Sequence, residues 1–76
     1  MPHVTVKMFT GRSKDQKQLI ANDVAAALMS NGIPESAISV SVEDVAPADW
    51  IDDVYNPEIR FKSSQIYKKP GYGPDV

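Results

Sequence analysis

The sequence predicts a small α/β (α+β) fold in which a strand, a helix and a second strand form a β-α-β unit, with a further helix near the C-terminus. Two stretches, residues 3–9 and 38–45, alternate apolar and polar side chains, which is typical of strands with one buried face. The segment between them carries apolar residues at helical spacing. Because strand, helix and strand follow in this order, we expect a two-stranded parallel pair with a right-handed crossover.

The first strand and the long helix have recognisable ends in the sequence. Residues 3–9 place three apolar side chains on one face, those of Val4, Val6 and Met8. Ser13 and Gln16 match a capping box, so the helix is expected to begin at Lys14. It is expected to end near Asn31, because Gly32 suits the position after a helix end. Its apolar face is expected to contain Ile20, Val24, Ala27 and Leu28, with Leu19 beside them.

The second half of the chain is predicted to contain one strand and one helix. Residues 38–45 alternate again, and Pro47 begins a turn or a single helical turn. Asn56 followed by Pro57 reads as a helix N-cap with proline at the first helical position, which predicts a helix from about Pro57 to Lys68. The tail from Tyr72 to Val76 is expected to be mobile unless it docks on a partner.

The length of the chain predicts one domain that needs a second copy to complete its core. Residues 1–76 form at most a single domain, and the chain contains no cysteine to form disulfides. Two strands and one helix leave sheet edges unpaired. Two copies joined edge to edge would form a four-stranded sheet with two helices on one face. The polar outer faces of the strands favour this homodimer over a hexamer of three dimers.

Composition excludes several classes of function. A net charge of −2 argues against a nucleic-acid partner. The sequence has no long apolar run for a membrane span and no basic-then-apolar start for a signal peptide, which favours a cytoplasmic protein. With one histidine and no cysteine, a metal site is not expected. No glycine-rich phosphate loop is present, and we expect no cofactor.

Pro2 is the strongest candidate for a catalytic residue. Aminopeptidases usually remove an initiator methionine that precedes proline, which would leave Pro2 with a free secondary amine. An α-amino group has a reference pKa of about 7.7–8.0, and burial or a nearby cation lowers the pKa further. Such an amine can act as a general base near neutral pH. The alternative is that proline at position 2, a common residue there, has no chemical role.

Two further residues could complete a site. Arg12 follows the first strand and precedes the long helix, so it could hold a carboxylate with paired hydrogen bonds. The alternative is a solvated loop charge. Trp50 could form a pocket wall that excludes water from the amine, although a core or interface position is its default interpretation. His3 lies on the polar strand face and is expected to be solvated rather than catalytic.

These features together resemble the 4-oxalocrotonate tautomerase family, and the resemblance covers most of the chain. It rests on Met1-Pro2, the short strand, Gly11-Arg12-Ser13 with Asp15-Gln16-Lys17, the long helix and the second strand. The C-terminal half is similar to the small dimeric branch, through Pro47, Trp50, Glu58-Ile59 and Lys68-Lys69-Pro70-Gly71-Tyr72. The resemblance implies a β-α-β fold assembled as dimers or hexamers, and tautomerisation of 2-oxo or 2-hydroxydienoic acids. It implies that Pro2 shuttles the proton, that Arg12 binds substrate and that Trp50 lines the pocket.

The chain departs from the family pattern at one position. Where the family's second substrate-binding arginine lies in the second strand, this sequence aligns Ser39, which is expected to take that substrate-binding position. Serine cannot supply a bidentate cation, so an enol monocarboxylate fits better than a dicarboxylate. Arg60 could enter the site from the second helix, but a solvated charge is favoured. We therefore expect a cofactor-independent tautomerase; the alternative is a non-catalytic dimeric binding or structural module that shares the fold.

Overall fold

The computed structural model describes residues 1–74, so the expectation about the tail up to Val76 lies partly outside the described residues. The chain divides into two compact units, Met1–Val45 and Ala46–Val76. Each unit is described by itself below. The expectation of one domain over residues 1–76 stays a prediction.

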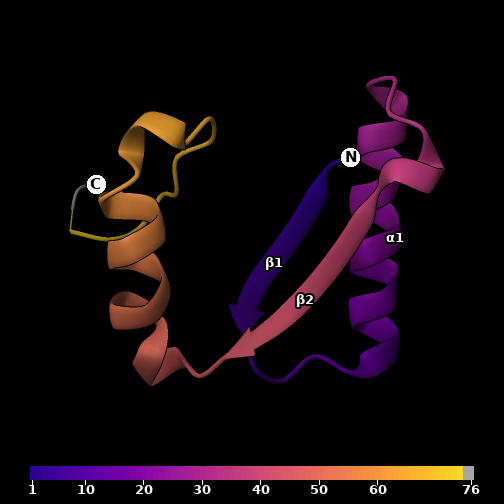
Figure 1. The fold of residues 1–76 in the computed structure, drawn as a ribbon. Helices are drawn as coiled ribbons and strands as arrows, with labels where there is room; N and C mark the ends of the chain where they lie inside the picture. Colours follow the sequence, from indigo (N-terminus) through magenta and orange to yellow (C-terminus); the bar gives the residue numbers. More distant parts are fainter. Residues whose placement is uncertain (75–76) are drawn as a thin grey trace. The chain divides into compact units, whose positions relative to one another are not determined.

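The N-terminal unit is the predicted β-α-β unit (Figure 1). Strand β1 spans His3–Phe9, helix α1 spans Lys14–Ser30, and strand β2 spans Ser39–Val45. A short 3₁₀ turn, η1 (Glu35–Ala37), leads from α1 into β2. The two strands pair in parallel along their full length, which confirms the predicted topology and the α/β fold class.

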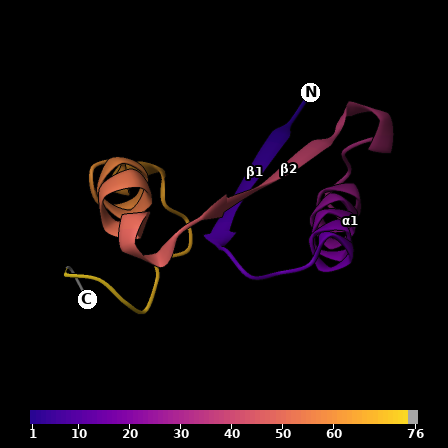
Figure 2. The ribbon, with the colours of Figure 1, turned by 90° about the horizontal axis from the view of Figure 1, so that it is seen from below.

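Helix α1 lies on one face of the two-stranded sheet (Figure 2). The register places His3 opposite Ser39 and each following residue opposite its counterpart. Because side chains alternate between faces, Val4 and Val6 of β1 and Val40 and Val42 of β2 share the face that carries Asp44, whereas Val45 is on the opposite face. The Asp44 carboxylate accepts a hydrogen bond from the Lys17 ammonium of α1 at 2.6 Å, so α1 lies against this face.

Both ends of α1 form as the sequence predicts. Ser13 Oγ accepts from the Gln16 N–H at 3.2 Å, and Gln16 Oε1 accepts from the Ser13 N–H at 2.9 Å, which completes the capping box. Gly32 adopts a φ of 89°, and its N–H donates to the Met29 carbonyl at 3.0 Å. The Ile33 N–H donates to the Leu28 carbonyl, so the helix ends in a Schellman motif.

The half-buried stripe of α1 differs in part from the expected one. Leu19 is 63% exposed and Ala27 is also exposed. The apolar residues that are partly covered are Ile20, Ala21, Val24, Ala25 and Leu28. Ile20, Val24 and Leu28 are spaced four residues apart, and Ala21 and Ala25 each follow one of them. A helix face with a period of 3.6 residues has this spacing.

The C-terminal unit contains the second helix, but its predicted start was wrong. A 3₁₀ turn, η2 (Pro47–Asp49), continues through Trp50 into helix η3 (Ile51–Arg60), and a further 3₁₀ turn, η4 (Ser63–Gln65), follows. The helix therefore begins earlier than Pro57 and ends before Lys68. Pro57, expected at the first helical position, lies inside the helix, and Asn56 makes no side-chain cap.

The geometry of η3 explains how it contains a proline. A proline inside an α-helix removes one hydrogen bond and its ring crowds the carbonyl four residues earlier. Helix η3 has π-helical turns, and the Phe61 N–H donates to the Asn56 carbonyl five residues earlier at 3.0 Å. Wider turns of this kind occur where the α-helical ladder is interrupted. The proline rule used for the sequence prediction assumes α-helical turns, and so it placed the helix start too late.

The only buried hydrophobic side chains among residues 1–74 are in η3. Val54 is 6% exposed and Tyr55 is 2% exposed. The chain after η4 returns to this helix, where the rings of Tyr55 and Tyr72 lie 5.7 Å apart at 48°. Gly73 has a φ of 103° and lies so close to Tyr55 that a Cβ there would overlap the ring. Residues 72 and 73 of the tail therefore pack on the chain's own helix.

We predict that Gly73→Ala destabilises the C-terminal unit. The added methyl group has to displace the buried Tyr55 ring, and overpacking of this kind costs about 1–3 kcal/mol. Gly71→Ala is the matched control, because a Cβ at position 71 meets open space. Urea unfolding followed by the fluorescence of Trp50 should show a lower midpoint for Gly73→Ala alone. Equal midpoints for the two variants would contradict the packing described here.

Candidate active site

Pro2 is held at the start of the sheet by a backbone hydrogen bond. Its carbonyl accepts from the Ser39 N–H at 3.2 Å, and Pro2 itself is half-buried. Met1, in contrast, is fully exposed. Because the hydrogen bond involves the Pro2 carbonyl and not its nitrogen, removal of Met1 would leave this anchor intact. The structure thus brings Pro2 and Ser39 together through their backbones.

The side chain of Ser39 has a different neighbour. Its Oγ lies 2.6 Å from His3 Nδ1, and His3 Nε2 lies 3.3 Å from Thr5 Oγ1. The Ser41 hydroxyl donates to Thr5 Oγ1 at 3.2 Å. These contacts form a polar chain across the exposed face of the sheet. His3 and Ser39 lie opposite each other in the strand register, so their side chains are on the same face of the sheet.

His3 is therefore a residue whose environment sequence reasoning missed. It was expected to be solvated, and it is exposed, but both ring nitrogens have hydroxyl partners. A neutral imidazole has one donor and one acceptor nitrogen, and serine and threonine hydroxyls can act as either. The alternating polar residues of the two strands were the sequence signal for these contacts, because parallel strands place polar residues of one face opposite each other.

Pro2 precedes β1 and Arg12 follows it, so the two residues lie at opposite ends of the strand. It is exposed in the connection to α1, directly before the cap residue Ser13. The residues of β1 rise about 3.3 Å each, which separates the two ends of the strand by about 20 Å. No arginine side chain spans that distance. Within one chain, the structure does not bring Arg12 to Pro2.

Trp50 belongs to the C-terminal unit, at the junction of η2 and η3. It is half-buried, and its indole Nε1–H donates to the Tyr72 hydroxyl at 2.9 Å. This hydrogen bond fixes the indole orientation within its own unit. The expected role of Trp50 as a wall beside Pro2 stays a prediction.

The described residues contain no group of three or more histidine, cysteine or acidic side chains placed to hold a metal ion. No helix within residues 1–74 is long and apolar enough to cross a membrane.

Comparison with known proteins assigns the chain to a family of enzymes. Residues 2–54 match the family model described as "Tautomerase enzyme". The chain belongs to the tautomerase family. It is 46% identical over 74 residues to a "Probable tautomerase" of Xylella fastidiosa (strain 9a5c), which covers 96% of this chain and 90% of the relative. It is 39% identical over 74 residues to "Tautomerase PptA" of Pectobacterium carotovorum subsp. carotovorum (strain PC1), covering 95% and 97% of the two chains.

Another relative extends the comparison. "Tautomerase PptA" of Escherichia coli O127:H6 is 30% identical over 74 residues, with the same coverage of 95% and 97%. The family match begins at Pro2, the residue that would become the N-terminus after removal of Met1. Family membership confirms the resemblance read from the sequence and supports an isomerase.

The structure makes a prediction about Ser39 in this tautomerase. Since the hydroxyl contacts His3, Ser39→Ala should leave KM and kcat within about two-fold, the effect of a surface substitution. Ser41→Ala on the same polar face is the matched control. Steady-state kinetics with an enol acid test this expectation. A rise in KM for Ser39→Ala alone would instead show that the hydroxyl binds substrate.

Proposed function

We propose that this chain catalyses the enol–keto or allylic tautomerisation of an unsaturated 2-hydroxy or 2-oxo acid, without a cofactor, after removal of Met1. The observation that carries the proposal is the anchoring of Pro2 by the Ser39 N–H beside a fully exposed Met1, in a chain of the tautomerase family. The free amine of Pro2 would take a proton from the enol hydroxyl or from a γ carbon. The protonated amine would then return a proton to the neighbouring conjugated carbon.

The position of Arg12 supports a site shared between two copies. If two sheets pair edge to edge in antiparallel orientation, the start of a strand in one copy lies beside the end of the equivalent strand in the other. Arg12 of the partner subunit would then approach Pro2, although the two residues lie at opposite ends of β1 in one chain. The arginine would bind the substrate carboxylate, and its charge would lower the pKa of the Pro2 amine.

The sparse burial in one chain also supports this assembly. None of the described residues of the N-terminal unit is fully buried. A homodimer with a four-stranded sheet would cover more of this apolar surface. We favour the dimer over the hexamer because the face of the sheet opposite α1 carries a chain of hydrogen-bonded polar residues.

The class of substrate follows from the number of cationic side chains that can bind a carboxylate in the proposed site. Ser39 stands where the resemblance places a second substrate-binding arginine, so only the Arg12 guanidinium is proposed to hold a carboxylate. An aryl or alkenyl enolpyruvate with one carboxylate fits such a site. Trp50 of the C-terminal unit is proposed to line the pocket and exclude water from the amine.

Ser39 also supports a second candidate function, a dimeric binding or structural module without catalysis. Loss of one anion-binding residue is what such a module would show. The mass of the protein purified from cells separates the two functions in part, because a retained Met1 leaves Pro2 as an amide that cannot accept a proton. Turnover of enol acids by the Met1-free protein would exclude the module.

Blocking Pro2 should abolish turnover. A chain with one extra residue before Pro2 has an amide nitrogen there, while the Ser39 anchor is unchanged, so circular dichroism should show normal folding. Pro2→Ala keeps a primary amine and should retain weak activity. In the processed enzyme, kcat/KM should rise with pH through an apparent pKa below about 7.7–8.0, because only the free amine is a base. Equal turnover by the extended chain would show that the base is elsewhere.

Mixing a variant that binds substrate weakly with one that lacks the base should restore activity at low substrate concentration if the site is shared. Arg12→Ala supplies an intact Pro2, and the chain extended before Pro2 supplies an intact Arg12. Random exchange of subunits makes half of the dimers mixed, each with one complete site, so the mixture should reach about a quarter of the unmodified rate. Light scattering should give twice the chain mass. No recovery in exchanged dimers would show that Arg12 acts in its own chain or not at all.

A further inference from the structure

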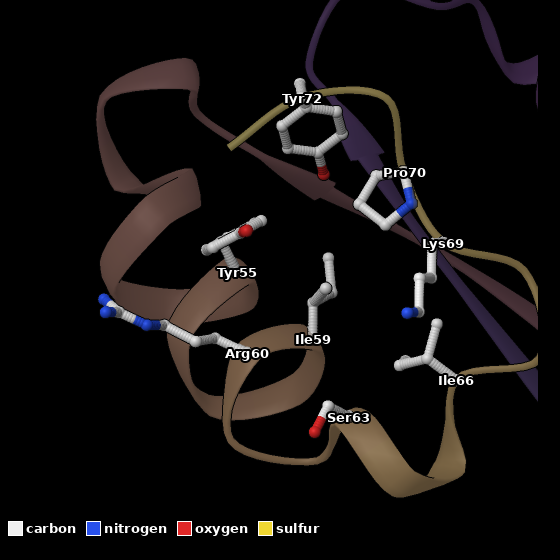
Figure 3. A pocket seen from close by; sticks show the side chains of 8 residues that line it. All are labelled: Tyr55, Ile59, Arg60, Ser63, Ile66, Lys69, Pro70 and Tyr72. Carbon is white, nitrogen blue, oxygen red and sulfur yellow. The ribbon is translucent and has the colours of Figure 1, made fainter. Parts of the chain in front are cut away.

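The C-terminal unit contains a cavity of about 270 Å³ that includes none of the four predicted site residues (Figure 3). It lies between η3, η4 and the segment that follows them. Eight residues line it, namely Tyr55, Ile59, Arg60, Ser63, Ile66, Lys69, Pro70 and Tyr72. All of them belong to one unit, so the cavity is defined by that unit alone.

The walls of the cavity suit an apolar ligand body. Tyr55 is buried, while Ile59, Ile66 and Pro70 are half-buried. The tilted pair of Tyr55 and Tyr72 rings presents aromatic edges and faces, against which a further unsaturated group can pack. No lining residue is acidic, so the charges around the cavity are positive.

The Tyr72 hydroxyl can donate a hydrogen bond to a ligand in the cavity. It points into the cavity in Figure 3, and it accepts from the Trp50 indole N–H at 2.9 Å. An indole N–H is a donor only, so this contact occupies an acceptor site of the phenol oxygen. The phenol proton therefore remains available for an acceptor in the cavity.

Lys69 adds a positive charge beside the same space. Its ammonium end points toward the side chains of Ile59 and Ile66 in Figure 3, and within residues 1–74 it forms no ion pair with a carboxylate. The Arg60 guanidinium is directed away from the cavity, and it lies 5.9 Å from the centroid of the Phe61 ring. Lys69 is consequently the cation that a ligand in the cavity would meet.

We propose that this cavity binds a small aryl or alkenyl monocarboxylate, with its carboxylate held by the Lys69 ammonium and the Tyr72 hydroxyl. The apolar walls take the unsaturated body, and the Lys69 ammonium and the Tyr72 hydroxyl are the donors that line the cavity. The volume of about 270 Å³ is near the lower end of the range of about 300–1,000 Å³ that is typical of small-ligand pockets, so a ligand as small as benzoate suits it. All the residues that line the cavity belong to the C-terminal unit, and the inference does not depend on the proposed catalysis.

Titration with benzoate tests the proposal, because benzoate cannot tautomerise. Trp50 is the only tryptophan, and its hydrogen bond to Tyr72 makes its fluorescence sensitive to the ligand. The unmodified protein should show a saturable change with benzoate. Benzamide has the same shape without charge and should bind about ten-fold more weakly, the size expected for loss of a charge-assisted hydrogen bond. Equal affinity for both, or no saturation, would overturn the proposal.

Variants then locate the binding site. Lys69→Gln and Tyr72→Phe should each weaken benzoate binding measured by calorimetry, and thermal unfolding should establish that both variants are folded. Lys68→Gln is the matched control, since Lys68 carries the same charge and does not line the cavity. Equal weakening by Lys68→Gln and Lys69→Gln would overturn the proposal in favour of non-specific charge.

An Arg12→Ala variant separates this inference from the proposed function, because Arg12 is the residue proposed to hold the substrate carboxylate. Benzoate binding should be unchanged in Arg12→Ala, even where turnover of enol acids falls. Loss of benzoate binding in that variant, with Lys69→Gln unaffected, would place the carboxylate at Arg12 and overturn the proposal. Failure of turnover with intact, Lys69-dependent binding would instead refute only the catalytic function.

Discussion

The hydrogen bond from the Ser39 N–H to the Pro2 carbonyl is the contact on which the candidate active site depends. It begins the parallel ladder between β1 and β2, and the ladder sets the register of every later pair. A proline has no N–H, so its carbonyl is the backbone group by which it can join a sheet. Its nitrogen is thereby left for chemistry once Met1 is removed. The same residue can be fixed in place and supply a free amine.

The register also decides which residues cannot act together in one chain. Pro2 is at one end of β1 and Arg12 follows the other end, about 20 Å away along a strand. A catalytic pair of these two residues therefore requires a second copy in antiparallel orientation. The low burial of the N-terminal unit agrees with this requirement, because side chains such as Leu19 remain 63% exposed in the single chain. Under the proposed function, pairing of two such sheets would complete the site.

The C-terminal unit is organised around Tyr55, which is 2% exposed. Tyr72 packs on its ring, and Gly73 approaches so closely that no side chain fits there. Trp50 completes the cluster by donating to the Tyr72 hydroxyl. These contacts hold the segment after η4 against η3 and so enclose the cavity that Lys69 borders. A glycine and three aromatic residues thus hold this segment beside the cavity, although the segment has little regular structure.

The sequence by itself determined the β-α-β unit and the capping box of Ser13 and Gln16, because these follow from periodicity and local hydrogen bonding. Only the tertiary structure decided where η3 begins, since a proline such as Pro57 is tolerated once wider turns relieve its ring. Only the tertiary structure, too, placed Arg12 away from Pro2 and gathered Lys69 and Tyr72 at one cavity. Proximity between residues distant in sequence depends on chain direction and packing, and local patterns do not encode either.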